Sequence, residues 1–206
     1  MVGCAGSFPG PDSAASCYLV EVEDGAGRTW RILLDLGSGA LGPLQRWVDP
    51  REVDAVLLSH LHPDHFLDLC GMYVLLRHHP DGPPPAKLPV FGPTGTLERL
   101  VRAYGPTDEA AIADVVDVRE WDDGQPVRIG PLSITPGRVV HPVEAYGVRL
   151  EADGAVLAYT GDTDTCPALT LLARDADLLL AEARSAYPGP VAVAHPGQVH
   201  RVGAEP

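Results

Sequence analysis

Three histidines and an aspartate lie within six positions in the stretch SHLHPDH, directly after an apolar run. Imidazole and carboxylate groups together favour zinc, with manganese or iron as alternatives. His60 and His62 are two positions apart, so in an extended segment both rings point the same way and can meet one ion. A group of solvated loop histidines is the simpler alternative. Because the cluster directly follows a buried strand, we consider solvated loop histidines the weaker interpretation.

Pro63 indicates a change of backbone geometry inside this stretch. A proline disfavours helix at the residue before it and permits a helix to start after it. We therefore expect Asp64 at a helix N-cap and His65 in the first turn. One loop can then present two pairs of ligands in two directions. Such an arrangement suits two metal ions about 4 Å apart, as in hydrolytic two-metal sites.

Two further strand ends could complete a metal site. His141 lies in RVVHPVEAYG and Asp162 lies in LAYTGDTD. A carboxylate has two oxygens and can bridge two ions. Taken alone, an aspartate at a strand end is usually a turn or helix cap, and Asp164 or Thr163 could serve as that cap instead. His141 and Asp162 gain weight as ligands in combination with the histidine cluster.

Other residues of the right types admit two interpretations. Asp35 follows a predicted strand and could hydrogen-bond a ligand histidine, or it could form a simple turn. Asp68, one helical turn after Asp64, has the same two alternatives. His78 and His79 precede PDGPPP at the end of a predicted helix, so we expect them on a solvated edge rather than in a metal site.

Length and charge limit the classes of protein that fit. The chain has 206 residues, and we interpret residues 1–206 as one domain. Fifteen Lys and Arg against 28 Asp and Glu give a formal net charge of −13, which opposes broad contact with nucleic-acid phosphates. The four cysteines form no C-x-x-C pair, so a zinc knuckle has no support. Neither a signal peptide nor a membrane-spanning stretch is visible, so we expect a cytoplasmic protein.

Hydrophobic periodicity predicts strands that alternate with helices. Strands are expected at 17–22, 29–35, 52–59, 87–92, 113–121, within 126–141, as a hairpin over 145–162, and from 177. Helices are expected before about residue 47 and at 65–79, 93–105 and 166–176. The last stretch, 185–202, is expected to be loop with one short strand. This order predicts two packed sheets with helices outside them.

These motifs resemble the metallo-β-lactamase superfamily. SHLHPDH matches its H-x-H-x-D-H signature, VVHPVEAYGVRL is similar to its third-histidine strand, and AYTGDTD is similar to its bridging-aspartate loop. The stretches GCAGSFPGPDSAASCYLVE and ILLDLGSGALG are similar to a bacterial branch near ribonuclease Z and related phosphodiesterases. The resemblance implies an α+β fold, a four-layer αββα sandwich with metal ions at one edge of its two sheets.

The resemblance also implies which residues bind metal. The implied ligands of the first ion are His60, His62 and His141; those of the second are Asp64 and His65; Asp162 bridges. The implied activity is metal-dependent hydrolysis, most simply of a phosphodiester, in which a metal-bound hydroxide attacks the phosphoryl or carbonyl centre. Asp64 would be the catalytic residue that orients or deprotonates this water. One or two zinc ions are implied, with manganese or iron as alternatives.

The chain also departs from the family pattern. After Leu180 we find neither the helix opened by an H-L-T-G-like motif nor the later histidine that completes the second metal site. We therefore expect an incomplete second sheet and a shortened first strand. A mononuclear or catalytically weakened metal-binding protein is the alternative function. His195 or His200 could fold back as a replacement ligand, but an exposed tail is the favoured interpretation. An unpaired sheet edge would favour association with a second copy of the chain.

The expected substrate is a small or cyclic phosphodiester. The acidic charge argues against a long nucleic acid, although processing of RNA ends remains an open alternative. Hydrolysis of a lactam or a thioester is also compatible with such a site, because a fold does not fix a substrate.

Overall fold

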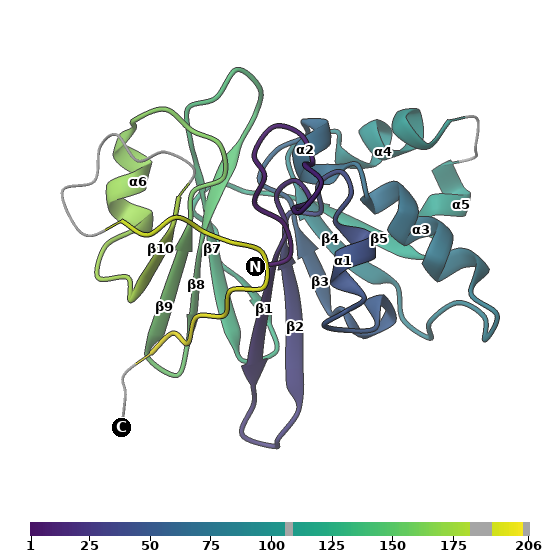
Figure 1. Cartoon of the computed structure of the whole chain (residues 1–206), viewed down its shortest axis with the longest axis horizontal. Helices are drawn as coiled ribbons and strands as arrows, with labels where there is room; N and C mark the ends of the chain where they lie inside the picture. Colours follow the sequence, from purple (N-terminus) through teal and green to yellow (C-terminus); the bar gives the residue numbers. More distant parts are fainter. Residues whose placement is uncertain (106–108, 182–190, 204–206) are drawn as a thin grey trace.

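Two five-stranded sheets face each other in the computed structural model, and helices lie on their outer sides (Figure 1). The structure describes residues 1–105, 109–181 and 191–203. The four layers are a helical layer, the first sheet, the second sheet and helix α6 (Pro167–Leu172). This α+β sandwich is the fold that the motifs predict.

The first sheet has the strand order β1-β2-β3-β4-β5. Its strands are β1 (Tyr18–Glu23), β2 (Thr29–Leu34), β3 (Ala55–Leu57), β4 (Leu88–Gly92) and β5 (Val116–Glu120). Strand β1 pairs antiparallel with β2, and β2 to β5 are parallel. The helical elements of this half are α1 (Leu41–Leu44), the 3-10 turn η1 (Pro50–Glu52), α2 (Pro63–Phe66), α3 (Leu69–His78), α4 (Thr96–Tyr104) and α5 (Glu109–Ala113).

The second sheet has the order β10-β9-β8-β7-β6. Its strands are β6 (Val127–Ile129), β7 (Leu132–Arg138), β8 (Tyr146–Ala152), β9 (Ala155–Tyr159) and β10 (Leu178–Leu180). Strands β6 to β9 form an antiparallel meander, and β10 runs parallel to β9. Within the described residues β10 is the outer strand on its side of this sheet, so association through this edge stays a prediction.

Alternation along the strands separates two hydrophobic clusters. In β2, Ile32 and Leu34 belong to the cluster between the sheets, where they pack with residues such as Ile134 and Leu150 of the second sheet. Leu33 points the other way and belongs to the cluster under the helices. Successive side chains of a strand face opposite sides, and each fully buried leucine stabilises the fold by roughly 1.5–3 kcal/mol. The second half of β2 is therefore buried on both faces of the sheet.

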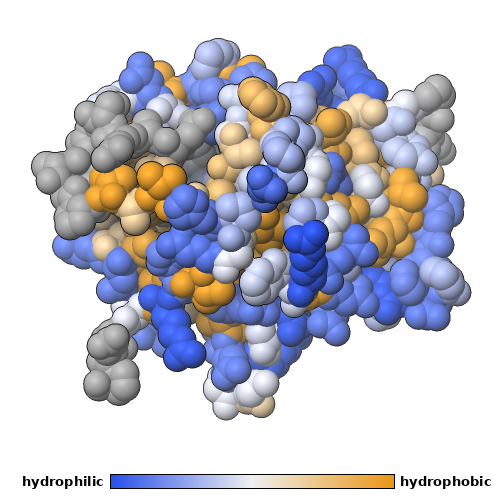
Figure 2. Space-filling view, in the orientation of Figure 1, coloured by the Kyte–Doolittle hydropathy of each residue, from blue (hydrophilic) through white to orange (hydrophobic). Residues whose placement is uncertain are grey.

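Helix α6 covers the second sheet by contact with β7 and β8. Leu172 of α6 is buried, whereas Leu171 is 62% exposed. Figure 2 shows hydrophobic residues at the surface on the side of the molecule where α6 lies in Figure 1. Among the described residues, no helix has the length and apolar character needed to cross a membrane.

The topology brings several strand ends to one edge of the sandwich. Parallel strands β2 and β3 end at the same edge, so Asp35 after β2 lies beside Ser59 and His60 after β3. Two hydrogen bonds join the segment directly after β3 to other parts of the chain: one to β8, and one to the connection between β5 and β6. The backbone N–H of Tyr146 donates to the Ser59 carbonyl (2.9 Å), and Trp121 Nε1 donates to the Leu58 carbonyl (2.9 Å).

Two local predictions were wrong, and a third is tested only in part. Helix α2 begins at Pro63 with His62 as N-cap, so Asp64 lies inside the first turn rather than at the cap; proline is favoured at the first helical position because its missing N–H needs no partner there. The single helix expected over 65–79 is divided into α2 and α3. The short strand expected within 185–202 is absent from 191–203, and residues 182–190 lie outside the described part.

Gly37 gives a test of how tightly the loop after β2 packs on α2. A Cβ at Gly37 would lie 1.8 Å from the Asp64 carbonyl oxygen, whereas one at Gly42 in α1 would meet nothing within 4 Å. We expect Gly37→Ala to lower the free energy of unfolding by about 1–3 kcal/mol, because two backbone segments must separate.

Gly42→Ala is the matched control, and we expect it to be neutral or stabilising by up to about 1 kcal/mol, since alanine is the better helix former. Urea denaturation of both variants measures the difference. Equal stability of the two variants would contradict the packing described for Gly37.

Candidate metal centre

Three imidazole rings converge at the edge where β3 ends. His60 Nε2 lies 3.1 Å from His62 Nδ1, and His141 Nε2 lies 3.1 Å from the same His62 nitrogen. His60 is fully buried, and the other two rings are partly exposed. These nitrogens form one group that could hold a metal ion. The structure therefore brings together two residues of the central motif and a third that is 79 positions away in the sequence.

A second group shares His60 and adds His65 and Asp162. His65 Nε2 lies 3.0 Å from Asp162 Oδ1 and 3.5 Å from Asp64 Oδ2. His60 Nε2 lies 3.9 Å from the other oxygen of Asp162. Asp162 thus faces both His60 and His65, which is the position that a bridging carboxylate needs. Asp64 borders the second group without belonging to it.

The loops that present His141 and Asp162 are tied to each other. Val140 and Asp164 form an antiparallel bridge, in which the Asp164 N–H donates to the Val140 carbonyl (2.8 Å). Gly161 lets the Asp162 loop approach β3: its φ is +56°, and a Cβ there would lie 2.6 Å from Ser59 Cβ. A residue with a side chain at 161 would push Asp162 away from His60.

A buried carboxylate lies beneath the second group. Asp35 is fully buried and has φ of +57°, an uncommon backbone conformation for a residue other than glycine. Asp35 Oδ1 accepts a hydrogen bond from the Ser59 N–H (2.7 Å). Asp35 Oδ2 accepts from Ser59 Oγ (2.8 Å), lies 2.7 Å from His65 Nδ1, and accepts from the Tyr159 hydroxyl. Of the two roles predicted for Asp35, the structure shows the hydrogen bond to the histidine.

The electrostatics of the centre favour a positive charge at its second group. Burial lowers the pKa of His60 to about 3, and the nearby charge of His65 acts in the same direction. Burial also lowers the pKa of His141. For His65, burial acts to lower the pKa, but the charges and hydrogen bonds of Asp35 and Asp162 outweigh it and raise the pKa to about 10. Carboxylates that stabilise a proton on His65 would also stabilise a metal cation beside it.

The spacing of the first group fits a tetrahedral ion. Zinc binds imidazole nitrogen at about 2.0–2.1 Å, which places neighbouring ligands of a tetrahedron roughly 3.3 Å apart. The two nitrogen–nitrogen distances at His62 are both 3.1 Å. His60 offers Nε2 while its Nδ1 lies 3.1 Å from Ser59 Oγ, a partner that can fix the ring orientation. The residues present therefore fit a divalent ion.

The remaining histidines and Asp68 lie elsewhere. Asp68 accepts hydrogen bonds from the backbone N–H groups of Gly39 and Leu41, so the turn role predicted for it is the one observed. His79 Nδ1 contacts Arg51, and His78 is exposed. His195 and His200 are also exposed, and neither joins a metal-capable group within the described residues.

The sequence analysis did not predict two residues that contact the centre, Ser59 and Tyr159. Ser59 precedes the first histidine, and its hydroxyl links Asp35 to His60. Tyr159 lies on β9, and its hydroxyl reaches Asp35 across the interface between the sheets. The only signal for Tyr159 in the sequence is its inward position in an alternating strand, three residues before Asp162. Packing against another sheet explains that position equally well.

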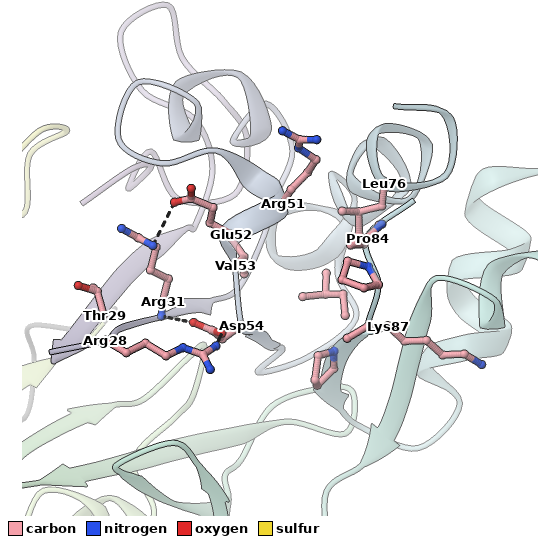
Figure 3. Close-up of a pocket in the computed structure, with 14 residues that line it drawn as sticks. Arg28, Thr29, Arg31, Arg51, Glu52, Val53, Asp54, Leu76, Pro84 and Lys87 are labelled. Atoms are coloured by element: carbon pink, nitrogen blue, oxygen red, sulfur yellow. Dashed lines mark hydrogen bonds and ion pairs between the residues drawn. The ribbon is translucent and has the colours of Figure 1, made fainter. Parts of the chain in front are cut away.

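A separate hollow of about 600 Å³ lies at the opposite end of the first sheet, where β2, β3 and β4 begin (Figure 3). Its lining includes Arg28, which pairs with Asp54, and Arg31, which pairs with Glu52. Lys87 extends away from these pairs (Figure 3). The arginines are largely neutralised by carboxylates, and the hollow lies far along the strands from the histidines. We therefore place the functional site at the histidine edge.

The two-sheet sandwich and the cluster of possible metal ligands at its edge are those of the metallo-β-lactamase fold. A family model described as "Beta-lactamase superfamily domain" matches residues 30–204. The chain belongs to this family.

Two relatives and the crystal structure of one of them support this membership. An uncharacterized protein of Mycobacterium leprae is 47% identical over 188 residues, which are 89% of this chain and 63% of that protein. The probable metallo-hydrolase YhfI of Bacillus subtilis is 30% identical, covering 88% of this chain and 70% of that protein. The crystal structure of YhfI has a TM-score of 0.73 at 28% identity, over 86% of this chain and 68% of that one.

Ribonuclease Z of Mycobacterium bovis is 32% identical over 199 residues, 87% of this chain and 68% of that protein. The chain thus spans about two thirds of the length of the curated relatives that it matches, and 63% of the Mycobacterium leprae protein.

Removal of His60 tests the centre directly, because both groups contain this residue. We expect His60→Ala to abolish tight Zn²⁺ binding at both groups. We expect His78→Ala, which removes an exposed histidine of the same chain, to leave binding unchanged. Equilibrium dialysis followed by elemental analysis measures the bound metal per chain. Full Zn²⁺ binding by the His60 variant would show that the ion binds elsewhere.

Proposed function

We propose that the protein is a metal-dependent hydrolase, most simply a phosphodiesterase that uses zinc. The observation that carries this proposal is the convergence of three imidazole nitrogens, at 3.1 Å spacings, beside the His65–Asp162 pair. We assign the ligands as His60, His62 and His141 for the first ion, Asp64 and His65 for the second, and Asp162 between the two. The family membership and the names of YhfI and ribonuclease Z support hydrolysis.

When bound, divalent ions would supply Lewis acidity and make a nucleophilic water available near neutral pH. Asp64 is the residue that we assign to orienting this water and accepting its proton. Its side chain is 13% exposed, and its Oδ2 lies 3.5 Å from His65 Nε2, so it borders the group and still reaches solvent. Asp162 holds its position through the tied loops at 140 and 164, which keeps the facing carboxylate in register with His60.

A small phosphodiester is the substrate that the charge distribution favours. The chain has a net charge of −13, and the cations Arg28, Arg31, Arg51 and Lys87 line the hollow at the other end of the first sheet. A long RNA would need cations along its phosphates near the histidine edge. A small or cyclic phosphodiester needs only the ions and their ligands. Ribonuclease activity is therefore the weaker assignment, although one relative is named ribonuclease Z.

One observation favours a second candidate, a mononuclear or weakened metal-binding protein. Within the described residues the second group has His65 and Asp162 as its own ligands, and it shares His60 with the first group. A second ion would then depend on Asp64 and on water to complete its coordination. One bound ion without turnover is the result that this candidate requires.

Turnover of bis(p-nitrophenyl) phosphate by the zinc-loaded protein tests the hydrolase proposal. We expect Asp64→Asn to lower kcat by about 100-fold or more, since a positioned acid or base contributes factors of this size. We expect Asp164→Asn, an equal change of charge two residues after Asp162, to retain activity. Removal of metal by a chelator should abolish turnover, and added Zn²⁺ should restore it. Unchanged activity of the Asp64 variant would contradict its assigned role.

A further inference from the structure

We propose that Tyr159 is a positioning residue for the second metal position, acting through Asp35 on His65. The inference rests on the metal centre proposed above and adds a residue to it. Tyr159 belongs to β9 of the second sheet, whereas Asp35 and His65 belong to the first-sheet half of the molecule. The hydroxyl of Tyr159 therefore carries an orienting contact from one sheet to the other.

The imidazole of His65 is held at both of its nitrogens. Asp35 Oδ2 lies 2.7 Å from Nδ1, and Asp162 Oδ1 lies 3.0 Å from Nε2. A histidine that donates its Nδ1–H to a carboxylate directs the lone pair of Nε2 outward, as a metal ligand requires. The orientation of the Asp35 carboxylate thus decides where His65 Nε2 points.

Tyr159 is linked to both partners of the His65 ring. Its hydroxyl donates to Asp35 Oδ2, on the Nδ1 side of His65. Tyr159 is the last residue of β9, and the loop that follows reaches Asp162 three residues later, on the Nε2 side. One strand end therefore sets both partners of the His65 ring. The phenol is buried with 4% of its surface exposed, so water cannot readily replace it as the donor to Asp35.

The first group of histidines has a separate support. The Ser59 N–H donates to Asp35 Oδ1, whereas the Tyr159 hydroxyl shares Oδ2 with the Ser59 hydroxyl. Loss of the phenol leaves the bond to Oδ1 in place, and with it the backbone that carries His60. We therefore expect loss of the Tyr159 hydroxyl to weaken the second metal position more than the first.

Tyr159→Phe removes the hydroxyl and keeps the ring in the core. We expect Zn²⁺ titration of the metal-free protein to show an unchanged first binding event and a second event weakened by about 10-fold or more, the size typical when a partner of a metal ligand is lost. Tyr146→Phe is the matched control, because it also removes a buried phenol bonded to a carboxylate, in this case Glu144 (3.0 Å). We expect its two binding events to match the wild type.

A double variant tests whether Tyr159 acts through Asp35. In the Asp35→Asn background we expect Tyr159→Phe to change the second dissociation constant by less than twofold, since the carboxylate it orients is gone. Should the Asp35 variant fail to fold, a second measurement replaces it. Nitrogen-15 NMR of the His65 ring in the metal-free protein would then show a changed chemical shift of Nδ1, which reports its hydrogen bond to Asp35, in Tyr159→Phe and an unchanged one in Tyr146→Phe.

Three results would overturn the proposal: equal weakening of both binding events by Tyr159→Phe, no weakening of either, or only one ion bound by the wild type. None of these measurements uses turnover. Failure of the hydrolase proposal would appear separately, as two bound ions without hydrolysis of bis(p-nitrophenyl) phosphate.

Discussion

The carboxylate of Asp35 is the contact on which the candidate centre depends, because it joins three parts of the chain inside the protein. It accepts hydrogen bonds from Ser59 after β3 and from Tyr159 on β9, and it contacts His65 in α2. A charged group without solvent contact is costly unless donors surround it. The surrounding donors remove that cost and fix the carboxylate in one orientation. Asp35 also lies in the left-handed backbone region, a conformation that the packing around it must maintain.

The two sheets contribute differently to the edge above Asp35. The first sheet supplies His60, His62 and His65 from the connection after β3, on a strand that is buried on both faces. The second sheet supplies His141 and Asp162 from loops that are tied to each other. Contacts at Leu58 and Ser59 hold these halves together beside the histidines. A rigid junction of this kind can keep ligand atoms within a few tenths of an ångström, as tight metal binding requires.

Charge separates the two ends of the first sheet. The histidine edge holds Asp35, Asp64 and Asp162, and the first and last of these raise the pKa of His65, so the edge favours a cation. At the other end, Arg28 and Arg31 are paired with carboxylates of their own. In a chain with a net charge of −13, this pattern is the basis on which we propose a small anionic substrate rather than a long polyanion.

The sequence by itself determined the family, most of the strands and the six candidate ligands, because the H-x-H-x-D-H spacing and the alternating strands are local patterns. Local patterns did not place the start of α2, since a proline that breaks a strand can also open a helix, nor did they predict α5. Only the tertiary structure decided that His141 lies 3.1 Å from His62 and that Asp35 contacts His65 rather than forming a simple turn. Only the structure showed that Tyr159 and Ser59 contact the centre, because sequence spacing carries no information about contacts between segments that are distant in the chain.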